Sequence, residues 1–275
     1  MGFMLNLGWI PIIFVLATVL AYFVPYFVAI YTGHVYPIFP AISDSGILEP
    51  ESLVFREMMN ISGFLAIATT FVRFLQLQLV ISSIHSRIPK QTEKLNLFSM
   101  ITGIVGGFAV TFVGNFSAKK EHAFAPVSEY SIHNVAAVIV FSSGLLYCAT
   151  QSAISFKMRR WRVNSIQMCL LRTAITFSVM INFTLFVIFS RWANYKYDVL
   201  HTGHSHVRKL GWRPGQNGYT QHLVSSITEW LMCLSLVFYS LTFVKELNFV
   251  RITTDFSEEY TIEDMIDSEN HIPGD

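Results

Sequence analysis

The sequence predicts an all-α protein, a bundle of six transmembrane helices with both termini in the cytosol. The 275 residues are 52% hydrophobic and only 13% charged, whereas about a quarter of a soluble domain is charged. No Asp, Glu, Lys or Arg occurs between Met1 and Ser43, a run far longer than the roughly 20 residues that cross a bilayer. The later apolar runs are too long and too uniform for the alternating strands of a membrane barrel.

Polar breaks separate six apolar segments of spanning length. The first has no basic residue before it and a long apolar core, so we expect a retained signal-anchor helix instead of a cleaved signal peptide. The third is uncharged, and its Gly103, Gly106 and Gly107 form a small-residue face that lets a neighbouring helix approach closely. We expect the spans at about residues 8–31, 59–81, 95–116, 130–156, 165–190 and 221–244, within a membrane domain of residues 1–250.

The second and fifth spans carry Arg73 and Arg172 toward their predicted cytosolic ends. Long arginine side chains near a helix end usually extend along the apolar surface and place the charge among the headgroups. We therefore expect both side chains to reach outward to the headgroups.

The distribution of Lys and Arg predicts which loops face the cytosol. The short loops 82–94 and 157–162 together contain seven basic residues, against three in loops 32–58 and 117–129. Basic residues accumulate in cytosolic loops, so both termini should be cytosolic and the loop 32–58 should lie on the opposite side.

The end of the chain has the opposite charge balance. From Arg251 onward there are 8 acidic residues and 1 basic residue, whereas the chain before it has 18 basic and 10 acidic residues. We expect residues 251–275 to form an acidic, disordered cytosolic tail. The basic excess of the body belongs to membrane loops, and no nucleic-acid signature accompanies it.

Polar side chains gather at the predicted non-cytosolic end of the bundle. Glu229 follows His222 by two helical turns, so both lie on one helix face. An unpaired ionisable group at that depth costs about 2–3 kcal/mol, which predicts that Glu229 faces the bundle interior. There it is either paired with His133, His222 or Arg56 or protonated. The candidate polar cluster comprises Asp44, Glu51, Asn60, Asn115, His133, His222 and Glu229.

Two interpretations of this cluster are open. It is either a hydrogen-bonded network that fixes helix register, which we favour, or a pocket for a lipid headgroup, an ion or a catalytic water. His222 and Glu229 are seven residues apart, unlike the closer spacing of helical metal ligands in H-E-x-x-H, and nucleophile-elbow and phosphate-loop motifs do not occur. We expect no catalytic residue, metal or cofactor, and the sequence leaves enzymatic activity open while favouring its absence.

Three segments together indicate a family. PAISDSGILEPE (residues 40–51) resembles the P-x-I-S-D-T-G-x-x-x-P-E segment of the damage-regulated autophagy modulator (DRAM) family, with Ser45 in place of the usual threonine. GWRPGQNGYTQHLVSSITEW (residues 211–230) and MMNISGFLAIATTFVRF (residues 58–74) are similar to that family's last loop and second helix. The resemblance extends over all six spans and into the wider Frag/DRAM/Sfk group.

The resemblance implies a multi-pass membrane protein that regulates autophagy and lysosomal function without catalysis. Its expected location is the lysosomal or endosomal membrane first and the plasma membrane second. The alternative is a lipid-handling or lipid-remodelling protein, acting on GPI lipids, phosphoinositides or phosphatidylserine through the polar pocket. Membrane lipids are the implied partners, protein partners in the membrane are left open, and nucleic acid is not implied. The resemblance transfers the positions of the candidate cluster and no mechanism.

Overall fold

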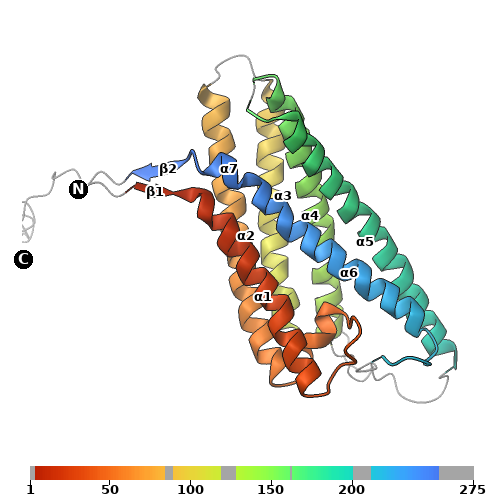
Figure 1. The fold of residues 1–275 in the computed structure, drawn as a ribbon. Coiled ribbons are helices and arrows are strands. Elements are labelled where there is room, and N and C mark those ends of the chain that lie inside the picture. The colour runs from red at the N-terminus through yellow and green to blue at the C-terminus, as the bar shows by residue number, and fades with distance from the viewer. Residues whose placement is uncertain (1–3, 84–88, 119–127, 162, 201–211, 254–275) are drawn as a thin grey trace, which may run out of the picture.

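The computed structural model describes residues 4–83, 89–118, 128–161, 163–200 and 212–253 (Figure 1). Six of its helices are long and apolar enough to cross a membrane, and each corresponds to one predicted span. They are α1 (Ile10–Tyr31), α2 (Glu51–Ser83), α3 (Lys90–Asn115), α4 (Glu129–Arg159), α5 (Ile166–Leu200) and α6 (Tyr219–Tyr239), which continues through η3 (Ser240–Phe243) into α7 (Val244–Leu247). The prediction of an all-α, six-span fold is confirmed.

The helices pack in chain order around the bundle. Helix α2 packs between α1 and α3, α4 packs between α3 and α5, and α6 returns against α5 and touches α1. In Figure 1, α1 and α6 lie in front of α2, α3 and α4 and diverge from each other away from the termini. The described loop residues 32–50, 116–118 and 212–218 lie at the end of the bundle away from the termini, which we call the loop end.

The two ends of the described chain meet in a small sheet. Strand β1 (Met4–Asn6) pairs antiparallel with β2 (Arg251–Thr253), with Met4 opposite Thr253. Both ends therefore lie on the same side of the bundle, as an even number of spans requires, and we call this the terminal end. The predicted tail begins with β2, and its remainder from residue 254 lies outside the described residues, so its disorder stays a prediction.

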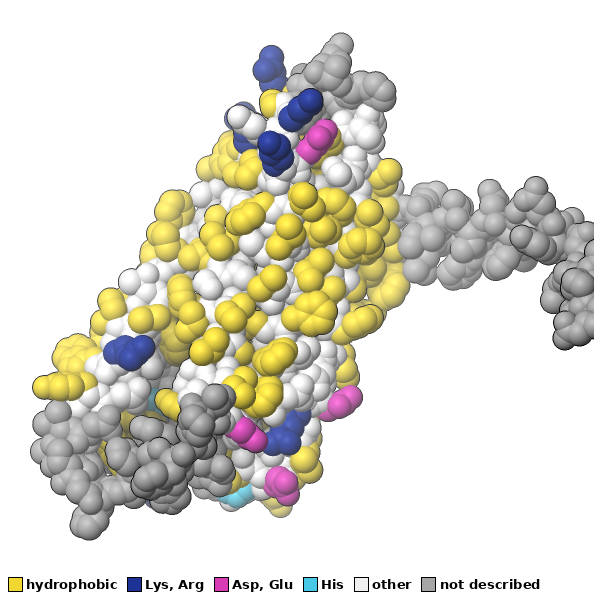
Figure 2. Space-filling view, turned by 180° about the vertical axis from the view of Figure 1, so that it is seen from behind, with side chains coloured by type: hydrophobic (Ala, Val, Ile, Leu, Met, Phe, Trp, Pro, Cys, Tyr) yellow, Lys and Arg dark blue, Asp and Glu magenta, His cyan; other side chains and the backbone are white. Residues whose placement is uncertain are grey.

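The outer surface of the bundle is apolar around its middle. Leu79, Phe108 and Val138 are among the large apolar side chains that are more than half exposed. Figure 2 shows hydrophobic side chains spread over the middle of one face, with Lys, Arg, Asp and Glu side chains mostly toward the two ends. A soluble protein rarely exposes so large an apolar area, so this band is the lipid-facing surface of an integral membrane protein.

Two helices extend well beyond their predicted spans. Helix α2 begins at Glu51, eight residues early, and α5 continues to Leu200, ten residues late. At about 1.5 Å per residue, the 33 residues of α2 are roughly 50 Å long, against a hydrocarbon core of about 30 Å. Hydropathy detects only the part inside lipid, and the polar ends continue the helix into the headgroup region.

The glycine face of α3 packs as predicted. A Cβ on Gly107 would lie 3.0 Å from the backbone oxygen of Gly63 on α2 and 2.5 Å from a side-chain carbon of Ile67. A Cβ on Gly106 would lie 2.8 Å from the Ser143 hydroxyl on α4. The absence of side chains lets α3 approach both neighbours closely.

Candidate functional site

The loop between α1 and α2 is fastened to three helices at the loop end. Its 3-10 helix η2 (Ile42–Gly46) packs on α1, α2 and α6. The Trp230 indole of α6 donates a hydrogen bond to the Pro40 carbonyl at 2.9 Å, and the Tyr26 hydroxyl of α1 donates one to the Pro37 carbonyl at 2.9 Å. Gly46 lies so close to Phe55 that a Cβ there would be 2.5 Å from the ring. This packing explains the turn-rich, glycine-containing sequence of the segment.

Asp44 and His222 are brought together, as the predicted cluster requires. Asp44 is 4% exposed, and its Oδ2 lies 3.7 Å from His222 Nε2. The His222 ring is stacked on Trp212, with ring centroids 4.6 Å apart and planes 10° apart. When His222 is protonated, this contact becomes an ion pair between the α1–α2 loop and the first turn of α6.

Glu51 has a partner outside the predicted cluster. Its Oε1 lies 2.6 Å from His34 Nδ1, and the residue is fully buried at the first position of α2. Helix N-termini favour carboxylates because their backbone N–H groups carry partial positive charge. Among the residues that the structure describes, the Glu51 Oε2 atom has no hydrogen-bond partner. His34 follows α1 directly, and no sequence spacing links it to Glu51.

Two further predicted residues form a pair between neighbouring helices. The side-chain amides of Asn60 on α2 and Asn115 at the end of α3 exchange two hydrogen bonds, of 3.1 and 3.0 Å. His133 Nδ1 lies 3.1 Å from the Val113 carbonyl and 2.9 Å from the Phe116 carbonyl. The last carbonyls of a helix lack partners within it, so His133 of α4 caps the end of α3.

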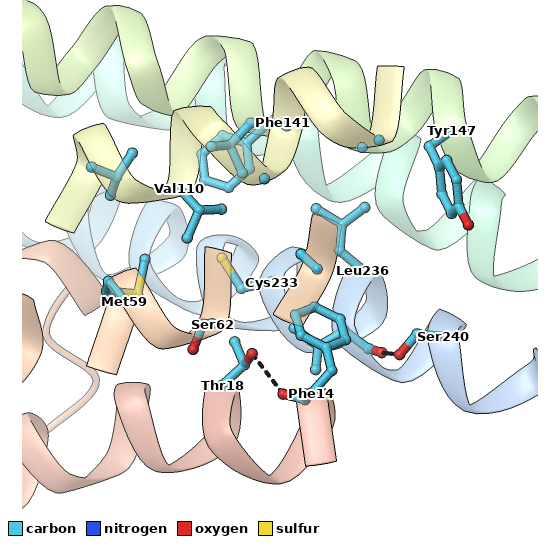
Figure 3. Close-up of a pocket in the computed structure, with 18 of the residues that line it drawn as sticks. Phe14, Thr18, Met59, Ser62, Val110, Phe141, Tyr147, Cys233, Leu236 and Ser240 are labelled. Carbon is cyan, nitrogen blue, oxygen red and sulfur yellow. Dashed lines mark hydrogen bonds between the residues drawn. The ribbon is translucent and has the colours of Figure 1, made fainter. Parts of the chain in front are cut away.

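Glu229 faces the bundle interior, as predicted. It is 7% exposed and lines, with His133, a cavity of about 160 Å³. Helices α1, α2, α3, α4 and α6 surround this cavity, and Figure 3 shows that Val110, Phe141 and Cys233 line it. The candidate residues thus occupy separate pairs and caps at the loop end, with His133 and Glu229 on the cavity wall.

A second polar cluster lies toward the terminal end, and it contradicts the expectation for the two arginines. Arg73 and Arg172 are fully buried and do not reach the headgroups. Arg73 Nη1 donates to Glu246 Oε2, and Arg172 Nη2 donates to Glu246 Oε1 at 2.9 Å. A carboxylate that bridges two guanidiniums lowers the cost of burying them, so both turn inward. We call these three residues the arginine–glutamate cluster.

Neutral groups complete the arginine–glutamate cluster. Arg73 Nε donates to the Gln151 side chain at 3.1 Å, and Arg172 Nη1 donates to the Ser155 hydroxyl at 2.6 Å. The ring of Phe243 lies against both guanidiniums, 4.5 Å from Arg73 Cζ and 4.8 Å from Arg172 Cζ. The cluster therefore joins α2, α4, α5 and the helical extension of α6 through buried polar contacts.

Glu246 was not among the predicted site residues because the sixth predicted span ends at residue 244. A usable signal was present, since two arginines within apolar spans require a counterion. Glu246 is the first acidic residue after the apolar run of α6, at the same end of the bundle.

No group of three His, Cys, Asp or Glu residues that could hold a metal ion occurs within the described parts of the chain. Cys148, Cys169 and Cys233 are free, buried thiols. In the described parts of the chain, the buried polar side chains form hydrogen bonds and ion pairs, and some of them line the cavity.

Six lipid-exposed helices around buried polar contacts define a multi-pass integral membrane protein. The Frag1/DRAM/Sfk1/Cwh43P N-terminal domain matches residues 6–249, so the chain belongs to this family. It is 30% identical over 258 residues to human DNA damage-regulated autophagy modulator protein 1, covering 93% of this chain and 98% of that protein. It is also 30% identical over 253 residues to mouse DNA damage-regulated autophagy modulator protein 2, covering 91% of this chain and 86% of that protein. No solved structure matches the chain.

Proposed function

We propose that this protein modulates autophagy from the membranes of lysosomes or endosomes and that it acts without catalysing a reaction. The observation that carries the proposal is similarity along almost the whole length of a protein named for that role, with 93% of this chain and 98% of the relative covered. The similarity includes the loops as well as the spans, so it is not limited to shared apolar composition.

The contacts at the loop end support a non-enzymatic role. Asn60 bonds Asn115, and His133 caps α3. Asp44 and Glu51 each lie against a histidine of another segment. These contacts fix the positions of the helices and of the α1–α2 loop, which is a structural role.

The proposed orientation places both termini in the cytosol and the loop end in the lumen. Ser45 is only 1% exposed, whereas Glu49 is exposed and suits chemical labelling. In sealed vesicles, Glu49→Cys should react with a membrane-impermeant thiol reagent only from the lumenal side. Arg160→Cys, which is exposed at the opposite end, should react from the cytosolic side. Reversed labelling of the two variants would overturn the orientation.

The function is tested in cells that lack the endogenous chain. We expect its removal to lower lysosome-dependent turnover of a cytosolic cargo reporter, and re-expression of the wild type to restore it. Tagged protein should overlap lysosomal or endosomal markers. Unchanged turnover after both removal and overexpression would refute the role in autophagy, and persistent plasma-membrane residence would refute the location.

A further inference from the structure

The central cavity lies between helices that cross the membrane, and its wall is largely apolar. Its volume is about 160 Å³, and apolar lining residues include Phe14, Met59, Val110, Phe141 and Leu236. Figure 3 shows them on several helices around one space. An engineered cavity of about 150 Å³ that is lined by Leu, Ile and Phe stays dry and takes up benzene.

Most serine and threonine hydroxyl groups on the wall have their protons engaged within the helix that carries them. Five of the seven donate to a backbone carbonyl three or four residues earlier in the chain, at 2.7–2.9 Å. These residues are Thr18, Ser62, Thr69, Thr102 and Ser240. A buried water requires two to four polar partners, and the middle of this cavity offers few donors.

An empty apolar cavity is unfavourable because its lining atoms lack contacts on one side. Around a membrane-spanning protein, the apolar groups present in great excess are the acyl chains of the bilayer lipids. A space close to that of a benzene-binding cavity fits the end of a single unbranched chain, and the fused rings of a sterol are much larger than benzene. The apolar wall and the volume of the cavity therefore both favour the end of an acyl chain as the occupant.

We propose that the central cavity binds the terminal part of one acyl chain of a membrane phospholipid. The lipid contact then lies within the apolar interior of the bundle and not at a polar pocket on its surface. The inference is independent of the proposed function, since acyl-chain binding is measured on purified protein without reference to autophagy.

The test uses purified full-length protein in nanodiscs that contain phosphatidylcholine with a diazirine on one acyl chain. After irradiation, peptide mass spectrometry locates the labelled residues. We expect labels on the inward-facing wall, around Ser62, Val110 and Cys233, in addition to the outer surface. Labels confined to outward-facing residues would overturn the proposal.

Two substitutions on α3 provide matched variants. Val110→Phe adds volume inside the cavity, whereas Val105→Phe adds the same volume at a position that is 45% exposed on the outer surface. We expect Val110→Phe to lower inward labelling several-fold and Val105→Phe to leave it unchanged. Thermal unfolding checks that both fold, and Ser62→Leu on α2 serves as the cavity-filling variant if Val110→Phe does not. Undiminished inward labelling in the folded cavity-filling variant would refute acyl-chain binding in the cavity.

A second probe, a sterol carrying a diazirine, distinguishes the source of the hydrocarbon. We expect it to label only the outer surface. Labelling of the cavity wall by the sterol and not by the acyl chain would overturn the proposed ligand class.

Discussion

Replacing Glu246 by glutamine should destabilise the bundle strongly. The substitution keeps the volume and removes the negative charge that bridges Arg73 and Arg172, both fully buried. Breaking a buried ion pair by removing one partner costs about 3–5 kcal/mol, because the remaining charge is left without compensation. Here two guanidiniums lose the same counterion, so we expect the upper part of that range.

The assay is thermal unfolding of the purified protein in detergent. With a shift of about 2–4 °C per kcal/mol for a chain of this size, a loss of about 4–5 kcal/mol corresponds to a Tm lower by roughly 8–20 °C. Glu93→Gln is the matched control, since Glu93 is exposed near the start of α3 and surface changes usually stay within about 0.5 kcal/mol. A Tm for Glu246→Gln within the range of this control would refute the view that Glu246 compensates both arginines.

Three smaller effects are expected. Gly107→Ala should cost about 1–3 kcal/mol of stability by overpacking α3 against α2, and a Tm equal to that of wild type would show that the helices can move apart freely. Trp230→Phe removes the hydrogen bond to Pro40 and should cost about 0.5–1.5 kcal/mol, with faster proteolysis of the α1–α2 loop as the readout. His222→Phe keeps an aromatic ring beside Trp212 but removes the imidazole from Asp44, so it should also cost about 1–3 kcal/mol; a stability unchanged by this variant would mean that stacking alone fixes the segment.

The spans could be predicted from the sequence because crossing lipid imposes one requirement on every helix, a long apolar stretch. Their ends could not, because nothing in the bilayer ends a helix at its surface. Helix α2 continues back to Glu51 and α5 forward to Leu200 through polar residues that hydropathy excludes. The glycine face of α3 was predictable because small residues have few other uses within a span.

The candidate site was predictable in part. The positions of the spans alone determine at which end of the bundle Asp44, His222 and Glu229 lie. These residues do lie at the loop end. Their pairing depends on tertiary packing, which sequence spacing does not encode. The partner of Glu51 is His34, and it lay outside the predicted cluster.

The arginines show the same limit more clearly. Within its own helix, each arginine lies near the end of a span, and an arginine side chain at such a position usually extends to the headgroups. The actual counterion of Arg73 is 173 residues away in the chain. The helical extension of α6, which brings Glu246 to both guanidiniums, and the polar side chains of α4 make the inward orientation favourable.

The order of synthesis gives the arginine–glutamate cluster a consequence for biogenesis. The ribosome produces Arg73 and Arg172 before Glu246, so the nascent chain holds two cations in its spans that lack their counterion until the last helix arrives. A chain that ends at residue 245 never receives it. We expect such a product to be degraded faster than the complete chain in a pulse-chase measurement, and equal lifetimes would contradict this. We therefore expect the stability of the earlier spans to depend on synthesis of the chain as far as Glu246.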